Sequence, residues 1–342
     1  MKFAKSDTVF VVATALVVML AAAVFCWSSI AAWFAPPLPP REKLTIAVNN
    51  IYPGSGLLYV AAKQGYFTQE GLDVTFQPHS SGRDALKAAL DKRAELGTVA
   101  DIPVMFAAVA GQPVSIVATL YTASRTHGIV ARRDRGIAGI ADLKNKVVGV
   151  TLRTDSHFVL STMLARQRIA LSEVRIEDLA PEAMLTALQS GKVDAVSTWE
   201  PGLSTASKAL GENGVEFRSE KRFVFNFNLA GQTDWVKANP GKIQGLLRAL
   251  LRAKRFADEK PQQARTMIVD AIKMDPGIFT AIGPHYHFVV QLNQNLLLML
   301  EDQARWAIQT KLTDRTVIPN FLDHIYMDPL TAVQADAVTI VR

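Results

Sequence analysis

From residue 44 onward, short apolar segments alternate with amphipathic ones, and this alternation predicts strands followed by helices. The apolar segments, each read as a strand, are Leu44–Val48, Leu72–Phe76, Val114–Leu120 and Lys146–Thr151. Helices are predicted for Leu57–Lys63, which stops before Gly65, and from Ser81-Gly82 to Leu90. Strands that alternate with helices indicate an α/β fold with a largely parallel sheet covered on both faces.

One arrangement of elements occurs twice, about 98 residues apart, which is the size of one α/β lobe. Each copy has a helix, a strand, a loop with an acidic residue and a proline that opens the next helix. The copies run from Ala85 to Pro103 and from Ala183 to Pro201. Because ligands in such sheets sit beyond the carboxyl ends of strands, both loops are expected to face one cleft.

The first forty residues have a different pattern, with no charged residue between Asp7 and Arg41. Val9–Trp27 is apolar apart from Thr14, and as a helix its nineteen residues would span roughly 28 Å, the thickness of a bilayer core. We therefore expect residues 9–35 to form a transmembrane helix. Lys2 and Lys5 precede it, so the positive-inside rule places everything after Arg41 on the exported side.

Three fates of this segment are compatible with the sequence. Its length and the aromatic pair Trp33-Phe34 favour an uncleaved anchor. Cleavage after the small residue Ala31 is the second alternative, and lipidation at Cys26 is disfavoured by the bulky Phe25 before it. The prolines of residues 36–40 follow as a stiff spacer, so residues 1–40 form an anchor, or a long signal peptide, with a spacer.

Composition excludes several classes of protein. Lys and Arg number 37 against 31 for Asp and Glu, and no run of five like charges occurs, which disfavours a nucleic-acid-binding protein. The single cysteine, Cys26, excludes a disulfide framework and cysteine-based metal sites. No Gly-x-Ser-x-Gly or His-Glu-x-x-His motif indicates an enzyme, and no cofactor or metal is expected.

Candidate ligand-binding residues lie in the loops that follow predicted strands. Tyr52 follows the first strand and either packs in its loop or lines the cleft. Ser81 begins a helix whose free N–H groups suit an anionic oxygen, although an ordinary N-cap has the same geometry. Thr98 and Asp101 precede the next helix; Asp101 is expected to be its N-cap, with contact to a ligand ammonium group as the alternative.

The second set of candidates comes from the later half of the repeat. Arg153 suits a sulfonate, nitrate or carboxylate because guanidinium offers two parallel donors, and Thr154 and Ser156 add hydroxyls. A surface arginine beside a helix cap is the alternative, and His157 is expected to face solvent. Trp199 and Glu200 follow a buried strand and suit an organic cation, so that Asp101, Glu200 and Arg153 together suit a zwitterion.

The order and spacing of several segments resemble the aliphatic-sulfonate, taurine and nitrate binding proteins of ABC importers. The segments that carry the resemblance are Leu58–Phe67, Glu70–Val74, Ser81-Gly82, Gly97–Pro103, Ile140–Val150, Leu179–Pro181, Gly191–Ala195 and Trp199–Pro201. The resemblance covers about Leu44 to Pro240. The same family includes thiamine-pyrimidine synthases, but these enzymes carry a cysteine-rich iron motif, whereas the only cysteine here is Cys26.

This resemblance implies a type II periplasmic binding protein fold, in which two α/β lobes enclose a ligand cleft. Residues 41–128 and 227–342 would form lobe 1, and residues 129–226 lobe 2, with crossings near 126–130 and 224–229. The implied function is capture of a small organic anion for an ABC permease and ATPase, without catalysis. A membrane-anchored sensory domain and, less favoured, a biosynthetic enzyme on this fold are the alternatives, and neighbouring permease or kinase genes would discriminate the first two.

Overall fold

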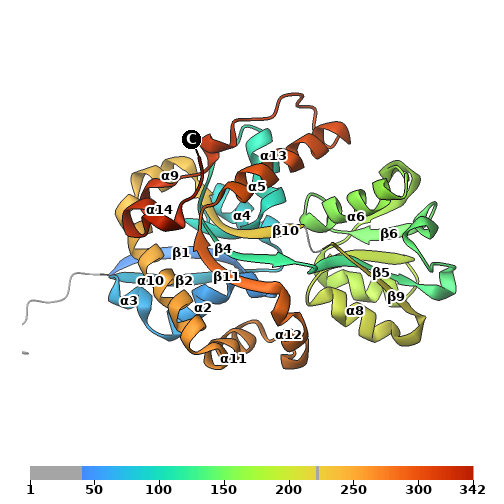
Figure 1. Ribbon diagram of the computed structural model, residues 1–342, viewed down its shortest axis with the longest axis horizontal. Helices are drawn as coiled ribbons and strands as arrows, with labels where there is room; N and C mark the ends of the chain where they lie inside the picture. The colour runs from blue at the N-terminus through green and yellow to red at the C-terminus, as the bar shows by residue number, and fades with distance from the viewer. Residues whose placement is uncertain (1–40, 221–222, 342) are drawn as a thin grey trace, which may run out of the picture. The chain divides into compact units, whose positions relative to one another are not determined.

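The computed structural model describes residues 41–220 and 223–341, which form a single compact unit built on two β-sheets (Figure 1). The expected membrane helix at 9–35 and the spacer lie outside the described residues. Within residues 41–220 and 223–341, no helix combines the length and the apolar character needed to cross a bilayer.

The first sheet has the strand order β11-β4-β10-β3-β1-β2. Its members are β1 (Glu42–Asn49), β2 (Leu72–His79), β3 (Leu96–Ala100), β4 (Val114–Ser124), β10 (Val224–Gln232) and β11 (Tyr286–Gln291). The second sheet has the order β7-β6-β8-β5-β9. Its members are β5 (His127–Arg132), β6 (Val147–Val150), β7 (Arg175–Asp178), β8 (Ala195–Trp199) and β9 (Gly214–Arg218).

Helices cover both faces of each sheet, as Figure 1 shows. Around the first sheet lie α2 (Gly56–Lys63), α3 (Tyr66–Gln69), α4 (Gly82–Leu90), α5 (Asp101–Val109), α9 (Thr233–Ala238), α10 (Pro240–Glu259), α11 (Pro261–Ile272), α12 (Pro276–Ile282), α13 (Gln294–Gln309) and α14 (Asp328–Val333). Around the second sheet lie α6 (Asp155–Arg166), α7 (Met184–Gln189) and α8 (Gly202–Leu210).

The strands and helices expected from the apolar pattern are present. Four of the six strands in the first sheet and four of the five in the second share one direction, so each sheet is largely parallel, as expected, but includes antiparallel strands. In the first sheet β1 pairs in parallel with β2 and β3, whereas β10 runs antiparallel to β3 and β4, and β11 antiparallel to β4. In the second sheet β5 is likewise antiparallel to β8 and β9. Each antiparallel pair contains a strand next to a crossing between the sheets, namely β4 or β10 in the first sheet and β5 in the second.

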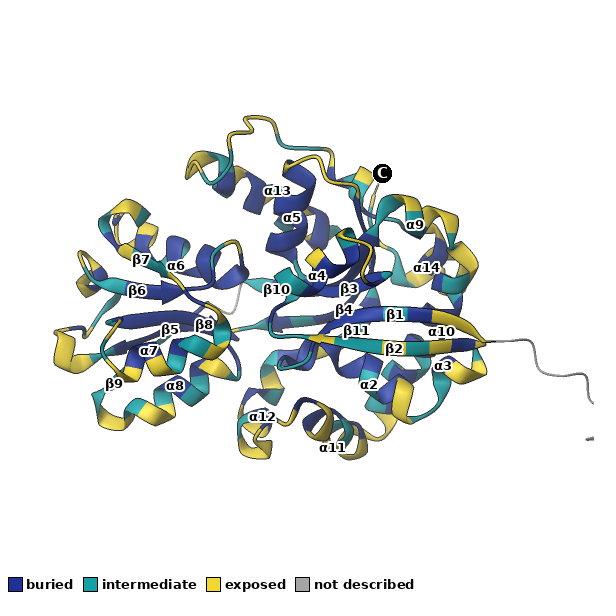
Figure 2. Cartoon of the chain, turned by 180° about the vertical axis from the view of Figure 1, so that it is seen from behind, coloured by how far each residue is buried: buried dark blue, intermediate teal, exposed yellow. Residues whose placement is uncertain are grey.

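The chain crosses between the sheets twice within the described residues. It leaves the first sheet after Ser124 and enters the second at His127, and it returns between Arg218 and Val224. Figure 2 shows dark blue, buried strands at the centre of each half. One large apolar cluster fills the first half, and two smaller clusters lie in the second. The large cluster also contains Phe158 and Trp199 of the second half, so the two halves touch through apolar side chains.

Candidate functional site

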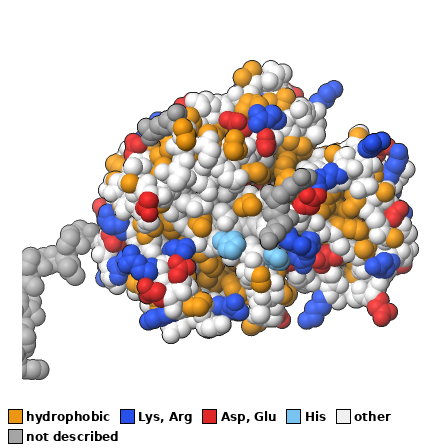
Figure 3. All heavy atoms as spheres, in the orientation of Figure 1, with side chains coloured by type: hydrophobic (Ala, Val, Ile, Leu, Met, Phe, Trp, Pro, Cys, Tyr) orange, Lys and Arg blue, Asp and Glu red, His pale blue; other side chains and the backbone are white. Residues whose placement is uncertain are grey.

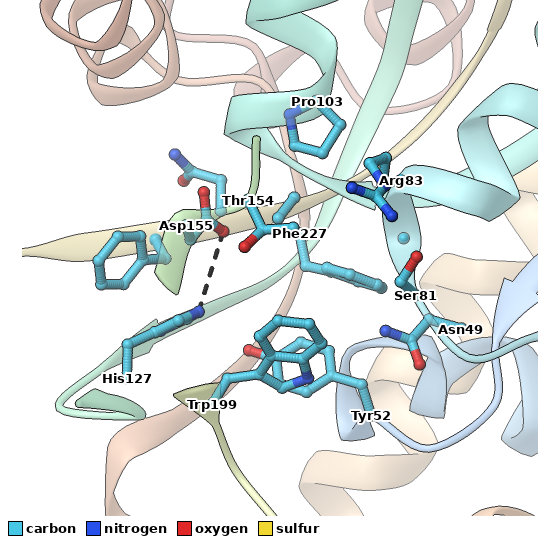
Figure 4. A pocket seen from close by; sticks show the side chains of 14 residues that line it. Asn49, Tyr52, Ser81, Arg83, Pro103, His127, Thr154, Asp155, Trp199 and Phe227 are labelled. Atoms are coloured by element: carbon cyan, nitrogen blue, oxygen red, sulfur yellow. Dashed lines mark ion pairs between the residues drawn. The ribbon is translucent and has the colours of Figure 1, made fainter. Parts of the chain in front are cut away.

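A cavity of about 40 Å³ lies between the two sheets, and we call it the cleft cavity (Figure 4). Its lining comes from the ends of strands and the starts of helices in both halves. The lining residues are Asn49, Tyr52, Ser81, Gly82, Arg83, Ala100, Pro103, His127, Thr154, Asp155, Trp199, Phe225, Asn226 and Phe227. The carboxyl ends of β3 and β8, which belong to the two copies of the sequence repeat, both contribute, through Ala100 and Trp199, so the two copies meet at one cavity as expected.

The start of α4 gives one end of the cleft cavity its positive character. Ser81 is the N-cap, as expected, because its side chain accepts a hydrogen bond from the Asp84 N–H at 3.1 Å. The first N–H groups of the helix have no carbonyl partner within it, which suits an anion. The Arg83 guanidinium lies at the same end, beside Ser81 and Asn49 in Figure 4, and its Nη1 donates to the Leu152 carbonyl of the second half at 2.9 Å.

The opposite end of the cleft cavity accepts hydrogen bonds. Asp155 is only 3% exposed; its Oδ1 accepts one long bond of 3.4 Å from the Ile102 N–H, and its Oδ2 lies 4.0 Å from His127 Nε2. Burial and the nearby Asp101 raise the pKa of Asp155 well above its ordinary value. Burial lowers the pKa of His127 to about 3, so its ring is neutral at pH 7. The buried Oδ1 of Asn226 has no hydrogen-bond partner.

Aromatic side chains lie along the cavity between its two ends: Figure 4 places Phe227 between Asp155 and Arg83, with Trp199 and Tyr52 below them. Tyr52 packs edge-on against Phe227 at 4.9 Å and Tyr121 at 5.5 Å between ring centroids. Both readings of Tyr52 therefore hold, because it is packed in its loop and also lines the cavity. The site has a donor end, an apolar middle and an acceptor end.

Four of the nine candidates from the sequence line this cavity: Tyr52, Ser81, Thr154 and Trp199. The side chain of Thr154 is committed to the Thr151 carbonyl, to which its hydroxyl donates at 2.7 Å. That these four residues contact a ligand stays a prediction.

The other five candidates do not line the cleft cavity, and most are held by partners inside the protein. The Thr98 hydroxyl accepts a hydrogen bond from the Asn49 N–H at 2.9 Å. Glu200 is fully buried; its carboxylate forms an ion pair with Arg218 at 2.7 Å and accepts a hydrogen bond from the Ser204 hydroxyl. Ser156 is buried and its hydroxyl has no partner. The remaining two, Asp101 and Arg153, differ from the expected local structure.

Asp101 is not the N-cap of α5, so that expectation is wrong. Ala100 occupies the cap position, and Asp101, the first residue of the helix, forms no capping bond. Its carboxylate instead accepts from the Asn226 N–H at 3.1 Å, Asn226 Nδ2 at 2.9 Å and Asn228 Nδ2 at 2.8 Å. These bonds tie α5 to β10, while burial raises the pKa of Asp101 to about 6.

Arg153 is exposed and its guanidinium lies over the Phe106 ring at 5.1 Å, outside the cleft cavity. Its φ of 59° turns the backbone into the left-handed region between β6 and α6. The expectation that His157 faces solvent is also wrong. His157 is 1% exposed, accepts from the Arg153 N–H at 3.4 Å and packs edge-on against Trp306 of α13.

The sequence argument missed Asn49, Arg83, His127 and Asp155, together with the aromatic residues at the start of β10. Arg83 follows the Ser81-Gly82 pair directly, and Asp155 stands beside Thr154, so both lay within one or two residues of the chosen candidates. Their position after a strand was the available signal.

Comparison with known proteins gives a family match over residues 53–264, more than half of the chain, to the model described as NMT1/THI5 like. A relative named "Putative binding protein" from Brucella abortus is 22% identical over 73% of this chain and 79% of its own length. A relative named "Putative aliphatic sulfonates-binding protein" from Bacillus subtilis is 21% identical over 79% of this chain and 83% of its own length.

Solved structures share the fold at lower identity. The alkanesulfonate-binding protein SsuA from Xanthomonas axonopodis pv. citri, bound to MOPS, is 17% identical with a TM-score of 0.73, covering 85% of this chain and all of that one. The desulfurization enzyme DSZB is 14% identical with a TM-score of 0.62, covering 86% of this chain and 99% of its own. The described residues therefore have an α/β fold of the periplasmic-binding-protein kind, and the chain belongs to the NMT1/THI5-like family.

Proposed function

We propose that the chain is the solute-binding component of an ABC importer and that it captures a small organic anion, sulfonate-like in its head group, in the cleft cavity. The observation that carries this proposal is the donor end of the cavity, where the start of α4 and the Arg83 guanidinium meet between the two halves. Relatives named for aliphatic sulfonates support the same class of ligand.

The acceptor end refines the ligand class. Asp155 and the unpartnered Asn226 Oδ1 offer only acceptors when Asp155 is ionised, so a solute with an N–H group at its far end would satisfy both. The aromatic side chains between the ends add favourable contact with a cation. A zwitterion such as an aminosulfonate fits this polarity, with Asp155, and not Asp101 or Glu200, binding its ammonium group.

The proposal extends to the parts that lie around the site. Residues 41–128 and 227–342 form one lobe and residues 129–226 the other, and the ligand is held where they meet. Residues 9–35 anchor the protein in the membrane, with the binding domain on the exported face, where a permease and its ATPase receive the solute. An anchored protein would stay in the membrane fraction after a carbonate wash, whereas release of a form beginning near Ala32 would indicate a cleaved signal peptide.

Binding without chemical conversion is the proposed activity, although one structural neighbour is a desulfurization enzyme. Figure 3 shows acidic and basic side chains interspersed on the face in view, which disfavours binding of a polyanion such as a nucleic acid to that face. Incubation with each probe below, followed by analysis of the products, tests the enzyme alternative. Formation of any product at a catalytic rate would contradict the proposal.

A thermal-shift screen of the full-length protein tests the proposed function. Probes are ethanesulfonate, taurine, nitrate, alanine and an aminopyrimidine, with sodium chloride as the ionic-strength control. Ligand that binds only the native state at about 100 times its Kd adds roughly 2.7 kcal/mol, enough to raise Tm by several degrees. We expect the sulfonates to raise Tm most. A response to none of the probes, or to chloride equally, would contradict the proposal.

A further inference from the structure

A second cavity of about 320 Å³ lies beside the cleft cavity, and we call it the side groove. Its walls come from the start of α7, the end of β8, the first turn of α8 and the loop after β1. The lining residues are Ile51, Pro181, Glu182, Met184, Leu185, Val196, Thr198, Trp199, Pro201, Gly202, Thr205 and Ala206. Most of these are apolar, and Glu182 is the one charged residue among them.

Trp199 forms part of the wall of both cavities. In the opposite half, two neighbouring residues line one cavity each: Ile51 lines the side groove and Tyr52 lines the cleft cavity. The two spaces therefore adjoin along the indole of Trp199 and the loop after β1. Both lie at the carboxyl ends of strands, where α/β proteins hold their ligands.

The two cavities differ in volume, and this difference suits them to different parts of a ligand. A volume of about 40 Å³ holds about three water-sized groups, at roughly 10–15 Å³ each, which is enough for a polar head group and little more. An organic solute with a longer chain or a ring needs further space. The side groove offers eight times that volume beside it, with an apolar lining suited to carbon rather than charge.

We propose that the side groove binds the apolar part of the same solute, an alkyl chain or aryl ring, whose polar head lies in the cleft cavity. This inference rests on the proposed function. The solute is then an amphiphile, which runs from Arg83 past Trp199 toward Met184 and Leu185. Trp199 contacts it at the junction, and the lining of the side groove sets the length of chain that the protein prefers.

Chain length gives the proposal a measurable consequence. Each methylene buried from water contributes about 0.8 kcal/mol, so affinity should rise about fourfold per added carbon until the groove is filled. Titration calorimetry of the full-length protein with ethane-, butane-, hexane- and octanesulfonate measures this slope. Four added carbons predict a rise of roughly 250-fold from ethane- to hexanesulfonate.

Two variants place the effect in the side groove. Thr205→Phe fills the groove from α8 without adding charge, and Leu185→Glu puts a carboxylate in its wall. Both should bind ethanesulfonate like the wild type and lose the gain with chain length. Leu171→Glu is the matched control, because Leu171 is a half-buried leucine of the same half that lines neither cavity, and it should keep the gain.

The outcomes separate this inference from the function on which it rests. If ethanesulfonate binds but affinity is flat along the series, the side groove has no such role while the proposed function stands. If Leu171→Glu abolishes the gain as fully as Leu185→Glu, the effect is one of charge alone and the inference is overturned. If no member of the series binds, both the inference and the sulfonate-binding function are wrong.

Discussion

Arg83 places a guanidinium at the donor end of the cleft cavity, 3.8 Å from the Asp84 carboxylate, and its replacement tests that end. Arg83→Ala should weaken ethanesulfonate binding at least tenfold, because the sulfonate loses a charge-assisted pair of hydrogen bonds on leaving water. Arg83→Lys should recover part of the affinity, since an ammonium group lacks the planar pair of donors. Titration calorimetry measures all three proteins.

Arg153→Ala is the matched control, because this arginine is exposed and lies over Phe106 instead of lining the cavity. It should bind ethanesulfonate like the wild type. A loss of affinity in Arg153→Ala with none in Arg83→Ala would reverse the assignment and return to the arginine that the sequence first suggested.

Asp155 governs the preference for solutes that carry an amino group. Burial raises the pKa of Asp155 and so favours the neutral carboxyl in the empty site, whereas a bound ammonium group favours the ionised form. Binding of taurine should therefore release a proton, and the affinity for taurine should rise with pH up to the pKa of Asp155. Calorimetry in buffers of different ionisation enthalpy counts that proton.

Asp155→Asn should remove both effects. Its ratio of taurine to ethanesulfonate affinity should fall about tenfold, and the buffer dependence should vanish, whereas ethanesulfonate binding should change little. Proton release that persists in Asp155→Asn would exclude this carboxyl as its source.

At the residue scale, the sequence located the loops of the site but not the side chains that turn into it. The sequence indicates Arg153 as a ligand-binding residue because an arginine between a strand and a helix suits an anion. Arg153 is exposed and has a left-handed backbone conformation, with a φ of 59°. Because few residues other than glycine adopt this conformation, the sequence does not predict it. Arg83 stands within a helical turn whose N-cap was identified correctly, so its direction follows from the helix.

At the scale of elements, the contact between α6 and α13 joins the two halves on one side of the cleft. Trp306 of α13 packs edge-on against Phe158 and His157 of α6, and its Nε1 donates to the Ser161 hydroxyl at 2.9 Å. Figure 1 shows α13, far along the chain, extending toward α6. This contact has one hydrogen bond and is otherwise apolar, and it stabilises the arrangement in which the two halves meet at the cleft cavity.

His157 makes this contact sensitive to acid. Burial lowers the pKa of His157 to about 4 from an ordinary value of 6.5, so the folded protein favours the neutral ring. The stabilisation is complete above pH 6.5 and is lost as the pH falls toward 4, because the unfolded chain binds the proton first. This lowering of the His157 pKa corresponds to about 3 kcal/mol of stability.

Urea unfolding at pH 7.5 and pH 4 measures this contribution. Between these values the free energy of unfolding of the wild type should fall about 3 kcal/mol more than that of His157→Asn, which keeps an acceptor but does not titrate. The exposed His287 of β11 offers the control His287→Asn, which should follow the wild type. Identical pH dependence in wild type and His157→Asn would place the acid sensitivity elsewhere.

Element positions could be predicted from the sequence more fully than strand directions. Apolar runs such as Leu44–Val48 and Val114–Leu120 fall within β1 and β4 because a buried strand needs apolar side chains whichever way it runs. The same runs carry no information on direction. The antiparallel entry of β5 and β10 follows from the two crossings between sheets, which are properties of the whole chain.

At the scale of the whole molecule, the two halves form one binding site because neither half supplies all of its lining. The donor end lies on β1 and α4 of the first sheet and its helices, whereas Thr154, Asp155 and Trp199 come from the second. The repeat in the sequence anticipated this arrangement, since it placed one loop of each half at the same cleft. It could not indicate how closely the halves approach, which depends on contacts such as Trp306 with α6.

The most direct test of the account is a crystal structure of the full-length protein grown with the sulfonate that raises Tm most. The account predicts density for the sulfonate head beside Ser81 and Arg83, between the two sheets, with the remainder of the solute directed past Trp199. Density for the head at another place on the molecule, or an empty cleft cavity at saturating sulfonate, would contradict it.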